Sequence, residues 1–293
     1  MQTFCEVYAL VCNSWNGEAT LTSQVDGIDT GTPDLLAKLH GKVLILTMHR
    51  PAARNAFSPA MLEALEYQLA LAEFDDRVGC IVLTGAEGAF CAGGDVKAMA
   101  AEQEGRTGAA MIQHQRKIQR GTAGKLFAML KPTIAAINGP AAGAGLSLAL
   151  ACDLRTISSE TFFTTAFAKV GLSGDFGGTY FLSQLVGTSR AREICYLSER
   201  VPAVEALQLG LVNRVFGREQ LLAETLVLAE RLASGPTIAL GYMKDNLNRA
   251  LLATPEECLD LEATNHIYCT TTRDHEEAAS AFVSKRQPVF EGR

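Results

Sequence analysis

The chain has 293 residues, of which 48% are hydrophobic and 20% are charged, and its formal net charge is −6. This is the composition of an ordinary soluble globular enzyme, and the length is ample for a packed core. It contains no long run of lysine or arginine, which argues against a nucleic-acid partner. No apolar run reaches about 18 residues, so neither a membrane span nor a membrane partner is expected.

Residues 1–33 are predicted to form an N-terminal extension, because turn formers such as Asn16, Gly17 and Pro33 interrupt any regular hydrophobic period. The start contains Glu6 and no basic segment, so it does not read as a secretory signal. The eight cysteines are scattered and form no CxxC pair, which argues against zinc or a redox dithiol. Reduced thiols in a cytoplasmic protein are expected.

The first half of the chain alternates short apolar strands with helices. Residues 35–40 and 43–48 flank the turn Gly41-Lys42 and predict a hairpin. Ser58-Pro59 then gives a helix N-cap followed by proline at the first helical position. The buried face of that helix is predicted to hold Met61, Leu62, Leu65, Leu69 and Leu71. Further strands are predicted at residues 80–84, 133–137 and 154–157, and helices at residues 96–130 and 141–150. The polar middle of the first of these helices, residues 102–107, suggests a lid.

The second half of the chain is predicted to be helical, and no internal repeat is visible. Strands alternating with helices indicate an α/β fold with right-handed crossovers. We expect a core over residues 34–200, and a C-terminal helical region over residues 201–293 that serves as an assembly surface. The predicted helices of the second half cover residues 177–186, 188–197, 203–209, 218–234, 236–253 and 255–281.

Three glycine-rich turns carry the candidate chemistry. Two of them, Phe90 to Asp95 and Gly139 to Gly145, each follow an apolar strand, and their small residues let backbone N–H groups approach a ligand closely. The third, Val170 to Thr179, holds a single acid, Asp175, ahead of an apolar helical run. That carboxylate either caps the helix or points into a cavity. One acid beside two turns of backbone donors indicates chemistry on a carbonyl compound.

Five sequence blocks carry a family resemblance. They are Arg50-Pro51 with Asn55-Ala56, Phe90-Cys91-Ala92-Gly93-Gly94-Asp95, Lys131-Pro132 with Asn138 to Gly145 and Cys152-Asp153, Gly171 to Thr179, and Ala203 to Val212. In this order and spacing they resemble the enoyl-CoA hydratase/isomerase, or crotonase, superfamily, from about residue 35 to the C-terminus. The resemblance implies a crotonase-like ββα spiral core, a C-terminal helical trimerisation region, and homotrimers or dimers of trimers.

In that family two backbone N–H groups bind the carbonyl oxygen of an acyl-CoA thioester, and by position these belong to Gly94 and Ala144 here. Proton removal beside the thioester, or water addition to a double bond, passes through an enolate-like species. One preorganised donor to its oxygen is worth about 3–4 kcal/mol. No cofactor is implied, because coenzyme A is part of the substrate.

The acids distinguish the reactions within the family. Hydratases carry two catalytic glutamates, but this chain has Ser147 and Phe167 at the matching positions, and neither suits proton transfer near neutral pH. A carboxylate matching Asp175 is the base in several isomerases, including the dienoyl-CoA isomerases and the epoxyphenylacetyl-CoA isomerase. The segment Ala166 to Leu172 is especially similar to the latter. The resemblance therefore favours an enoyl-CoA isomerase in which Asp175 moves a proton.

Three other activities stay open. The first is an enoyl-CoA hydratase with atypical acid/base residues, and the second is a non-catalytic scaffold that binds acyl-CoA. The third, an aryl-CoA dehalogenase, would need a histidine base and aromatic walls. The only tryptophan, Trp15, lies in the extension, and His114 is the only histidine near the expected pocket. His114 is better explained as an exposed polar residue of the helix.

The resemblance also implies how coenzyme A is held. Backbone groups at Ala56 and Ala92 would meet the adenine, and the segment Asp95-Val96-Lys97 would flank the pantetheine, with Lys97 near a phosphate. Lys285, beside Arg286, stands where family members contribute a basic group, in some cases from a neighbouring subunit. Asp153 is expected to be a structural hydrogen-bonding residue.

Overall fold

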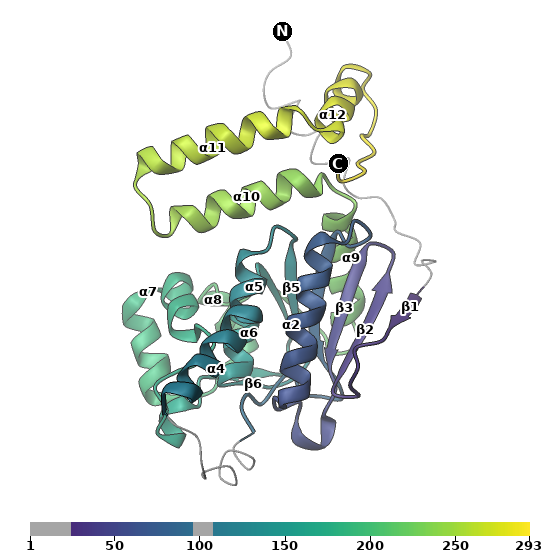
Figure 1. The fold of residues 1–293 in the computed structure, drawn as a ribbon. Helices are drawn as coiled ribbons and strands as arrows, with labels where there is room; N and C mark the ends of the chain where they lie inside the picture. The colour runs from purple at the N-terminus through teal and green to yellow at the C-terminus, as the bar shows by residue number, and fades with distance from the viewer. Residues whose placement is uncertain (1–24, 96–107) are drawn as a thin grey trace.

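A seven-stranded sheet forms the centre of the computed structural model, which describes residues 25–95 and 108–293 (Figure 1). The strand order is β1-β2-β3-β4-β5-β7-β10, for β1 (Val25–Ile28), β2 (Leu35–His40), β3 (Val43–Met48), β4 (Cys80–Gly85), β5 (Thr133–Ile137), β7 (Leu154–Ser158) and β10 (Arg214–Phe216). β1, β2 and β3 pair antiparallel, and the strands from β3 to β10 pair parallel. Segments that leave the parallel strands therefore meet at one edge of the sheet.

The strands have the burial that their places in the sheet require. β4 lies between two parallel neighbours, and all six of its residues are buried, as expected for a strand covered on both faces. β2 lies nearer the edge and alternates instead, with Leu35 and Ala37 buried and Leu36 and Lys38 exposed. The predicted hairpin over residues 35–48 is confirmed, including its turn.

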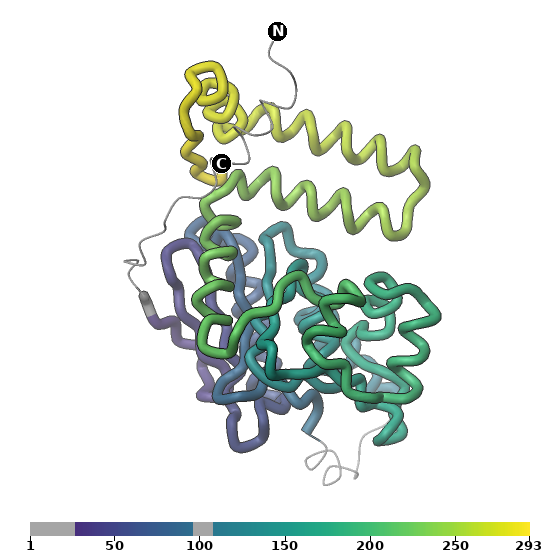
Figure 2. The backbone as a smooth tube through the Cα atoms, turned by 180° about the vertical axis from the view of Figure 1, so that it is seen from behind, coloured from purple at the N-terminus to yellow at the C-terminus, as the bar shows by residue number. Residues whose placement is uncertain are grey.

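Helices cover both faces of the sheet. On one face, α2 (Pro59–Phe74) and α6 (Ala144–Leu150) pack on strand residues such as Leu46 and Leu83. On the other face, Ala229 and Ala233 of α9 (Leu221–Ala233) pack on Val82 and its neighbours. Figure 2 shows α9 against the sheet from behind. The two apolar clusters form the core.

The start of α2 confirms the predicted cap. The Ser58 hydroxyl accepts a hydrogen bond from the Met61 N–H at 3.1 Å, and Pro59 opens the helix. Four of the five apolar residues expected on its inner face are buried, but Leu71 is 49% exposed, which corrects that expectation. The turns of the helix place Gln68 and Ala72 on the core side and carry Leu71 away from it.

A second, small sheet corrects the helix expected over residues 141–150. Ala141 and Ala142 form the strand β6, and the helix α6 begins at Ala144. The cause is tertiary, because β6 pairs with a short strand from much later in the chain. The strands of this sheet are β6 (Ala141–Ala142), β8 (Phe162–Thr164) and β9 (Val201–Pro202).

The remaining helices complete the fold. Gly187, at φ 74° and ψ 162°, breaks α7 into the two segments that the sequence predicts. The helical stretch predicted over residues 255–281 is also divided in two. No helix in the described ranges is both long and apolar enough to span a bilayer. The helices are η1 (Pro51–Ala53), α4 (Gly108–Gly121), α5 (Ala123–Ala128), η2 (Phe167–Val170), α7 (Gly178–Leu197), α8 (Ala203–Gln208), α10 (Thr237–Ala250), α11 (Pro255–Thr270) and α12 (Arg273–Val283).

Both boundaries of the expected core differ in the structure. Residues 25–28, placed in the extension, form β1 at the edge of the main sheet. Residues 214–216, placed in the helical region, form β10 beside β7, and α9 belongs to the core. In Figure 1 the helices α10, α11 and α12 lie together above the upper end of the sheet. Strands of three or four residues carry too little hydrophobic pattern to be seen in the sequence.

Candidate active site

Residues 50–56, 90–95 and 138–145 follow the carboxyl ends of β3, β4 and β5, which are adjacent and parallel. The turns after β4 and β5 are joined directly, since the Ala142 N–H donates to the Cys91 carbonyl at 2.9 Å. Gly93 has φ +86°, and a β-carbon built on it would lie 2.8 Å from the Ala142 oxygen and 3.0 Å from the Ala144 nitrogen. Only glycine fits this contact. The predicted donors, Gly94 and Ala144, are therefore brought together.

The two amides are available to a ligand. Ala144 is the first residue of α6, where an N–H has no partner within its own helix. In the part of the chain that the structure describes, neither Gly94 nor Ala144 donates its N–H to a protein acceptor. Two adjacent, unengaged N–H groups are what an oxyanion would require.

Two buried side chains, which the sequence reasoning did not single out, fix these turns. The Cys91 Sγ donates to the Asn55 carbonyl at 3.0 Å and accepts the Gly93 N–H at 3.3 Å. Burial raises the pKa of the Cys91 thiol to about 12, so it keeps its proton as a donor. The Asn55 amide nitrogen donates to the carbonyls of Ala86 and Ala89, at 2.8 and 2.9 Å. Both residues stand inside the sequence blocks that resemble the family, and this position was the sequence signal that could have identified them.

Asp175 lies beside the same turns. The ring of the next residue, Phe176, is 5.3 Å from the ring of Phe57, whose N–H donates to the Gly93 carbonyl at 2.8 Å. The carboxylate is half-buried and accepts the Phe176 N–H at 2.9 Å. It does not cap the following helix, because α7 begins at Gly178 and no amide of its first turn bonds to this side chain in the described residues.

Two glutamines of α4 also reach Asp175. The Gln115 amide nitrogen lies 2.8 Å from each carboxylate oxygen, and the Gln119 amide donates to Oδ1. His114, the histidine considered from the sequence, is exposed on another side of this helix. No group of three histidine, cysteine, aspartate or glutamate side chains within residues 25–95 and 108–293 is placed to hold a metal ion.

The two positions at which hydratases carry glutamate face one cavity. Ser147 and Phe167 both line a space of about 340 Å³, together with Gly143 and Gly178. The described residues that line it include no acidic, basic or histidine side chain. The Ser147 hydroxyl donates to the Gly143 carbonyl of its own helix at 3.2 Å. This cavity adjoins Ala144 and offers mainly apolar contacts.

Arg50 joins two of the residues expected to meet coenzyme A. Its guanidinium donates to the Ala56 carbonyl at 2.7 Å and pairs with the Asp95 carboxylate at 3.2 Å. Ala92 is exposed, and its N–H donates to the Arg54 carbonyl at 3.0 Å. Val96 and Lys97 lie outside the described residues.

Lys285 is not brought to this group within one chain. It follows α12, at the end of the molecule opposite α4 and β6 (Figure 1). The C-terminal tail is held there, since Lys42 in the β2–β3 turn donates to the Glu291 carbonyl at 3.3 Å. Arg286 is engaged by Glu277, with the Nη2–Oε2 distance at 2.7 Å. A role for Lys285 at the site would thus need a neighbouring subunit.

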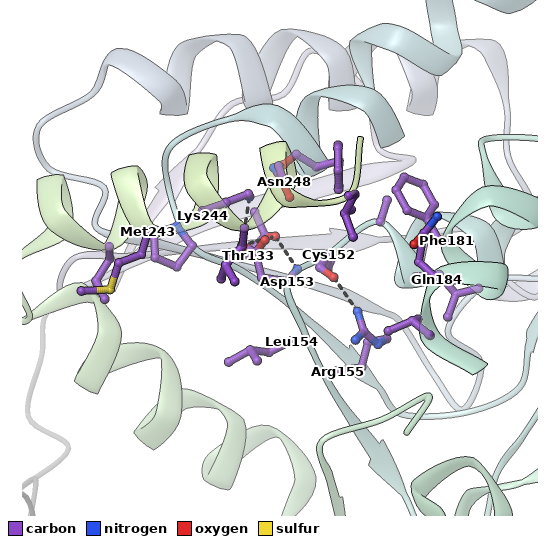
Figure 3. Close-up of a pocket in the computed structure, with 18 of the residues that line it drawn as sticks. Thr133, Cys152, Asp153, Leu154, Arg155, Phe181, Gln184, Met243, Lys244 and Asn248 are labelled. Carbon is purple, nitrogen blue, oxygen red and sulfur yellow. Dashed lines mark hydrogen bonds and ion pairs between the residues drawn. The ribbon is translucent and has the colours of Figure 1, made fainter. Parts of the chain in front are cut away.

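A second cavity, of about 510 Å³, lies between the core and α10 (Figure 3). Lys244 of α10 donates to Asp153 at 2.9 Å, and Asp153 also accepts the Thr133 N–H at 2.8 Å. Burial raises the pKa of the Asp153 carboxyl, and Lys244 opposes that shift. Asp153 thus joins α10 to the sheet, in keeping with the structural role expected for it.

Comparisons with known proteins identify the family. Residues 38–293 match the family model described as enoyl-CoA hydratase/isomerase. The chain is 34% identical to the 1,2-epoxyphenylacetyl-CoA isomerase of Escherichia coli K12, over 88% of this chain and 98% of that protein. It is 33% identical to the short-chain-enoyl-CoA hydratase of Clostridium acetobutylicum, over 87% and 96% of the two chains.

The fold has solved counterparts as well. The crystal structure of an enoyl-CoA hydratase from Polaromonas sp. JS666 superimposes with a TM-score of 0.83 at 32% identity, covering 87% of this chain and 99% of that one. The family model and the relatives span nearly the whole described structure, and both glycine-rich turns lie within the match. This chain belongs to the enoyl-CoA hydratase/isomerase family of acyl-CoA enzymes and has the crotonase fold.

Proposed function

We propose that the protein is an enoyl-CoA isomerase that uses Asp175 as its base and the N–H groups of Gly94 and Ala144 as its oxyanion hole. One observation carries the proposal. Phe176, the residue after Asp175, packs on Phe57, which bonds to the turn that contains Gly94, while Ser147 and Phe167 occupy the positions at which hydratases have glutamates. The described residues lining the adjoining cavity carry no acidic, basic or histidine side chain.

The reaction follows from these groups. Asp175 removes a proton from the carbon next to the thioester carbonyl of a 3-enoyl-CoA, and negative charge moves onto the carbonyl oxygen. The Gly94 and Ala144 amides stabilise that oxygen, each contributing about 3–4 kcal/mol to the transition state. Asp175 then returns the proton at the far end of the double bond, which yields the conjugated 2-enoyl-CoA. A single base serves both transfers, so no water enters the product.

Coenzyme A enters as part of the substrate, with no separate cofactor in this scheme. Ala56, Ala92 and Asp95 would hold it from one chain, and Lys285 would come from a neighbouring subunit of a homotrimer or a dimer of trimers. Exposed apolar side chains on α10 to α12 support assembly through these helices. They include Leu247 (70% exposed), Leu259 (66%) and Phe282 (69%).

The test is to mix purified protein with 3-hexenoyl-CoA in heavy water and to follow mass and ultraviolet spectra. The expected result is the conjugated 2-enoyl ester without a hydroxyacyl ester, with deuterium gained to the extent that the Asp175 carboxyl exchanges its proton with the heavy water before delivering it. A hydroxyacyl ester as the first product would refute the isomerase assignment. If aliphatic and aromatic esters bind but do not react, the result would favour a non-catalytic binding scaffold.

A hydratase is the second candidate. It is favoured by the names of relatives such as the 2,3-dehydroadipyl-CoA hydratase of Escherichia coli K12, at 35% identity over 89% of this chain. In that case Asp175 alone would orient the water. Incubation of the 2-enoyl ester in water separates the two candidates, because only the hydratase forms a 3-hydroxyacyl ester.

A further inference from the structure

The helix α4 presents two glutamine side chains to one carboxylate. Gln115 and Gln119 are four residues apart, so they lie on the same face of the helix, one turn from each other. Both are partly buried, whereas Gln113 and His114 on other faces are exposed. α4 packs against α2 and α5, which belong to the core side of the sheet. The pair is therefore held by the fold and does not depend on loop residues.

The donors are distributed unequally over the carboxylate. Oδ1 of Asp175 accepts from Gln115 at 2.8 Å, from the Phe176 N–H at 2.9 Å, and from Gln119. Among the described residues, Oδ2 accepts only from Gln115, also at 2.8 Å. A carboxylate oxygen has about two lone-pair sites, so Oδ1 is saturated and Oδ2 retains a free one. Oδ2 is consequently the atom that can take a proton.

The chemical nature of the donors matters too. Every side chain that donates to Asp175 among the described residues is a neutral amide. A lysine or arginine there would form an ion pair with the base and stabilise its charged form strongly. Carboxamides orient the carboxylate without adding a charge next to the enolate that the reaction would form.

We infer that Gln115 and Gln119 are positioning residues that clamp Oδ1 of Asp175 and turn Oδ2 toward the substrate proton. This inference rests on the proposed isomerase function and assigns the proton-carrying atom within it. The two glutamines act through Asp175 and contact no reacting atom themselves. A base that rotates freely would spend less time aligned with the proton, and misplacement by about 1 Å can cost about 10²-fold in rate.

The experiment compares Gln115→Met, Gln119→Met and the double variant with Gln113→Met, using 3-hexenoyl-CoA with and without deuterium at C2. Methionine keeps the length and helix propensity of glutamine but removes the donor. We expect kcat to fall about 10-fold in each single variant and about 100-fold in the double variant, with KM within threefold. The ratio of kcat for the light and heavy substrates should equal or exceed the wild-type ratio, because proton transfer becomes slower. Gln113→Met should match the wild type.

Two results would overturn the inference. The first is a double variant whose kcat stays within twofold of the wild type. The second is a loss of rate in which KM rises in proportion or the isotope ratio falls, since that is how general damage to the site would behave. If the double variant does not fold, the single variants decide. Asp175→Asn distinguishes a failure of the proposed function from a failure of the clamp. If that variant is active, the proposed function itself fails. If it is inactive while the glutamine variants behave like the wild type, only the clamp fails.

Discussion

Gly178 packs on Ser147 so closely that a β-carbon built on the glycine would lie 2.2 Å from the serine hydroxyl oxygen. The contact seats the first turn of α7 on α6, the helix that opens with Ala144. Asp175 lies three residues before Gly178, and its carbonyl accepts the Gly178 N–H at 3.0 Å. One glycine thus sets the distance between the candidate base and one candidate oxyanion donor.

The first prediction concerns this contact. Gly178→Ala should lower the free energy of unfolding by about 1–3 kcal/mol, because an added methyl group has no room against Ser147. Adding Ser147→Gly should restore part of the loss, which a double-mutant cycle measured by urea unfolding would show. Gly108→Ala is the matched control, since nothing lies within 4 Å of a β-carbon at that helical glycine. Strictly additive losses in the cycle would contradict the contact.

Asp175→Asn tests the base. The asparagine side chain keeps the size of aspartate but cannot accept a proton, so kcat for the double-bond shift should fall by about 10²- to 10⁴-fold. Binding of the ester should change by less than threefold, because the amides of Gly94 and Ala144 remain in place. Kinetics and calorimetric binding of a saturated acyl-CoA are the two measurements. A variant with wild-type turnover would remove Asp175 from the mechanism.

Lys285→Ala tests the expectation that a neighbouring subunit completes the coenzyme A site. Loss of one charged contact to a phosphate should raise KM for the CoA ester about tenfold and leave kcat within twofold. The same variant should act normally on a pantetheine ester, which lacks the nucleotide phosphates. Lys38→Ala, at an exposed position of β2, is the control and should change neither substrate. An equal effect on both esters would argue against phosphate recognition.

The buried pair of Lys244 and Asp153 should make stability depend on pH. Burial raises the pKa of Asp153 above its unfolded value, so this group favours the folded state at low pH and loses that contribution as pH rises through the folded pKa. The positive charge of Lys244 opposes this rise in the pKa of Asp153. Lys244→Met should therefore cost about 3–5 kcal/mol at pH 7. The cost should shrink as pH falls and Asp153 takes up a proton.

Urea unfolding of Lys244→Met and of the wild type at pH 7 and at pH 4.5 measures this difference. Arg218→Met serves as the control, because it breaks an exposed pair with Glu160, and should cost at most about 1 kcal/mol at either pH. If the deficit of Lys244→Met were the same at both values, Asp153 would not be the group responsible.

The parts of the fold that could be read from the sequence are those with local causes. The strands on either side of Gly41-Lys42 and the cap at Ser58 depend on neighbouring residues, and both were predicted correctly. The short strands β8, β9 and β10 depend on distant partners and were missed. Ala141 and Ala142 show the same effect, because their pairing with β8 overrides a helix-like composition.

The residues of the candidate site also fall into those that the sequence could predict and those that it could not. Gly94, Ala144 and Asp175 stand in sequence blocks that resemble a family, so their positions could be named in advance. Gln115 and Gln119 could not, since a glutamine on a helix is an ordinary surface residue until the structure shows what it meets. Their relation to Asp175 joins segments 56 and 60 residues apart, and no local pattern records it.

The candidate oxyanion donors are main-chain N–H groups, whereas the candidate proton carriers are side chains. A point mutation can erase a carboxylate in one step, but it cannot delete a peptide N–H except by introducing proline. As sequences of the family diverge, the oxyanion hole would therefore be kept nearly unchanged, while the side chains at positions 147, 167 and 175 are free to vary. Relatives named for water addition and for isomerisation are each identical to this chain at about one residue in three.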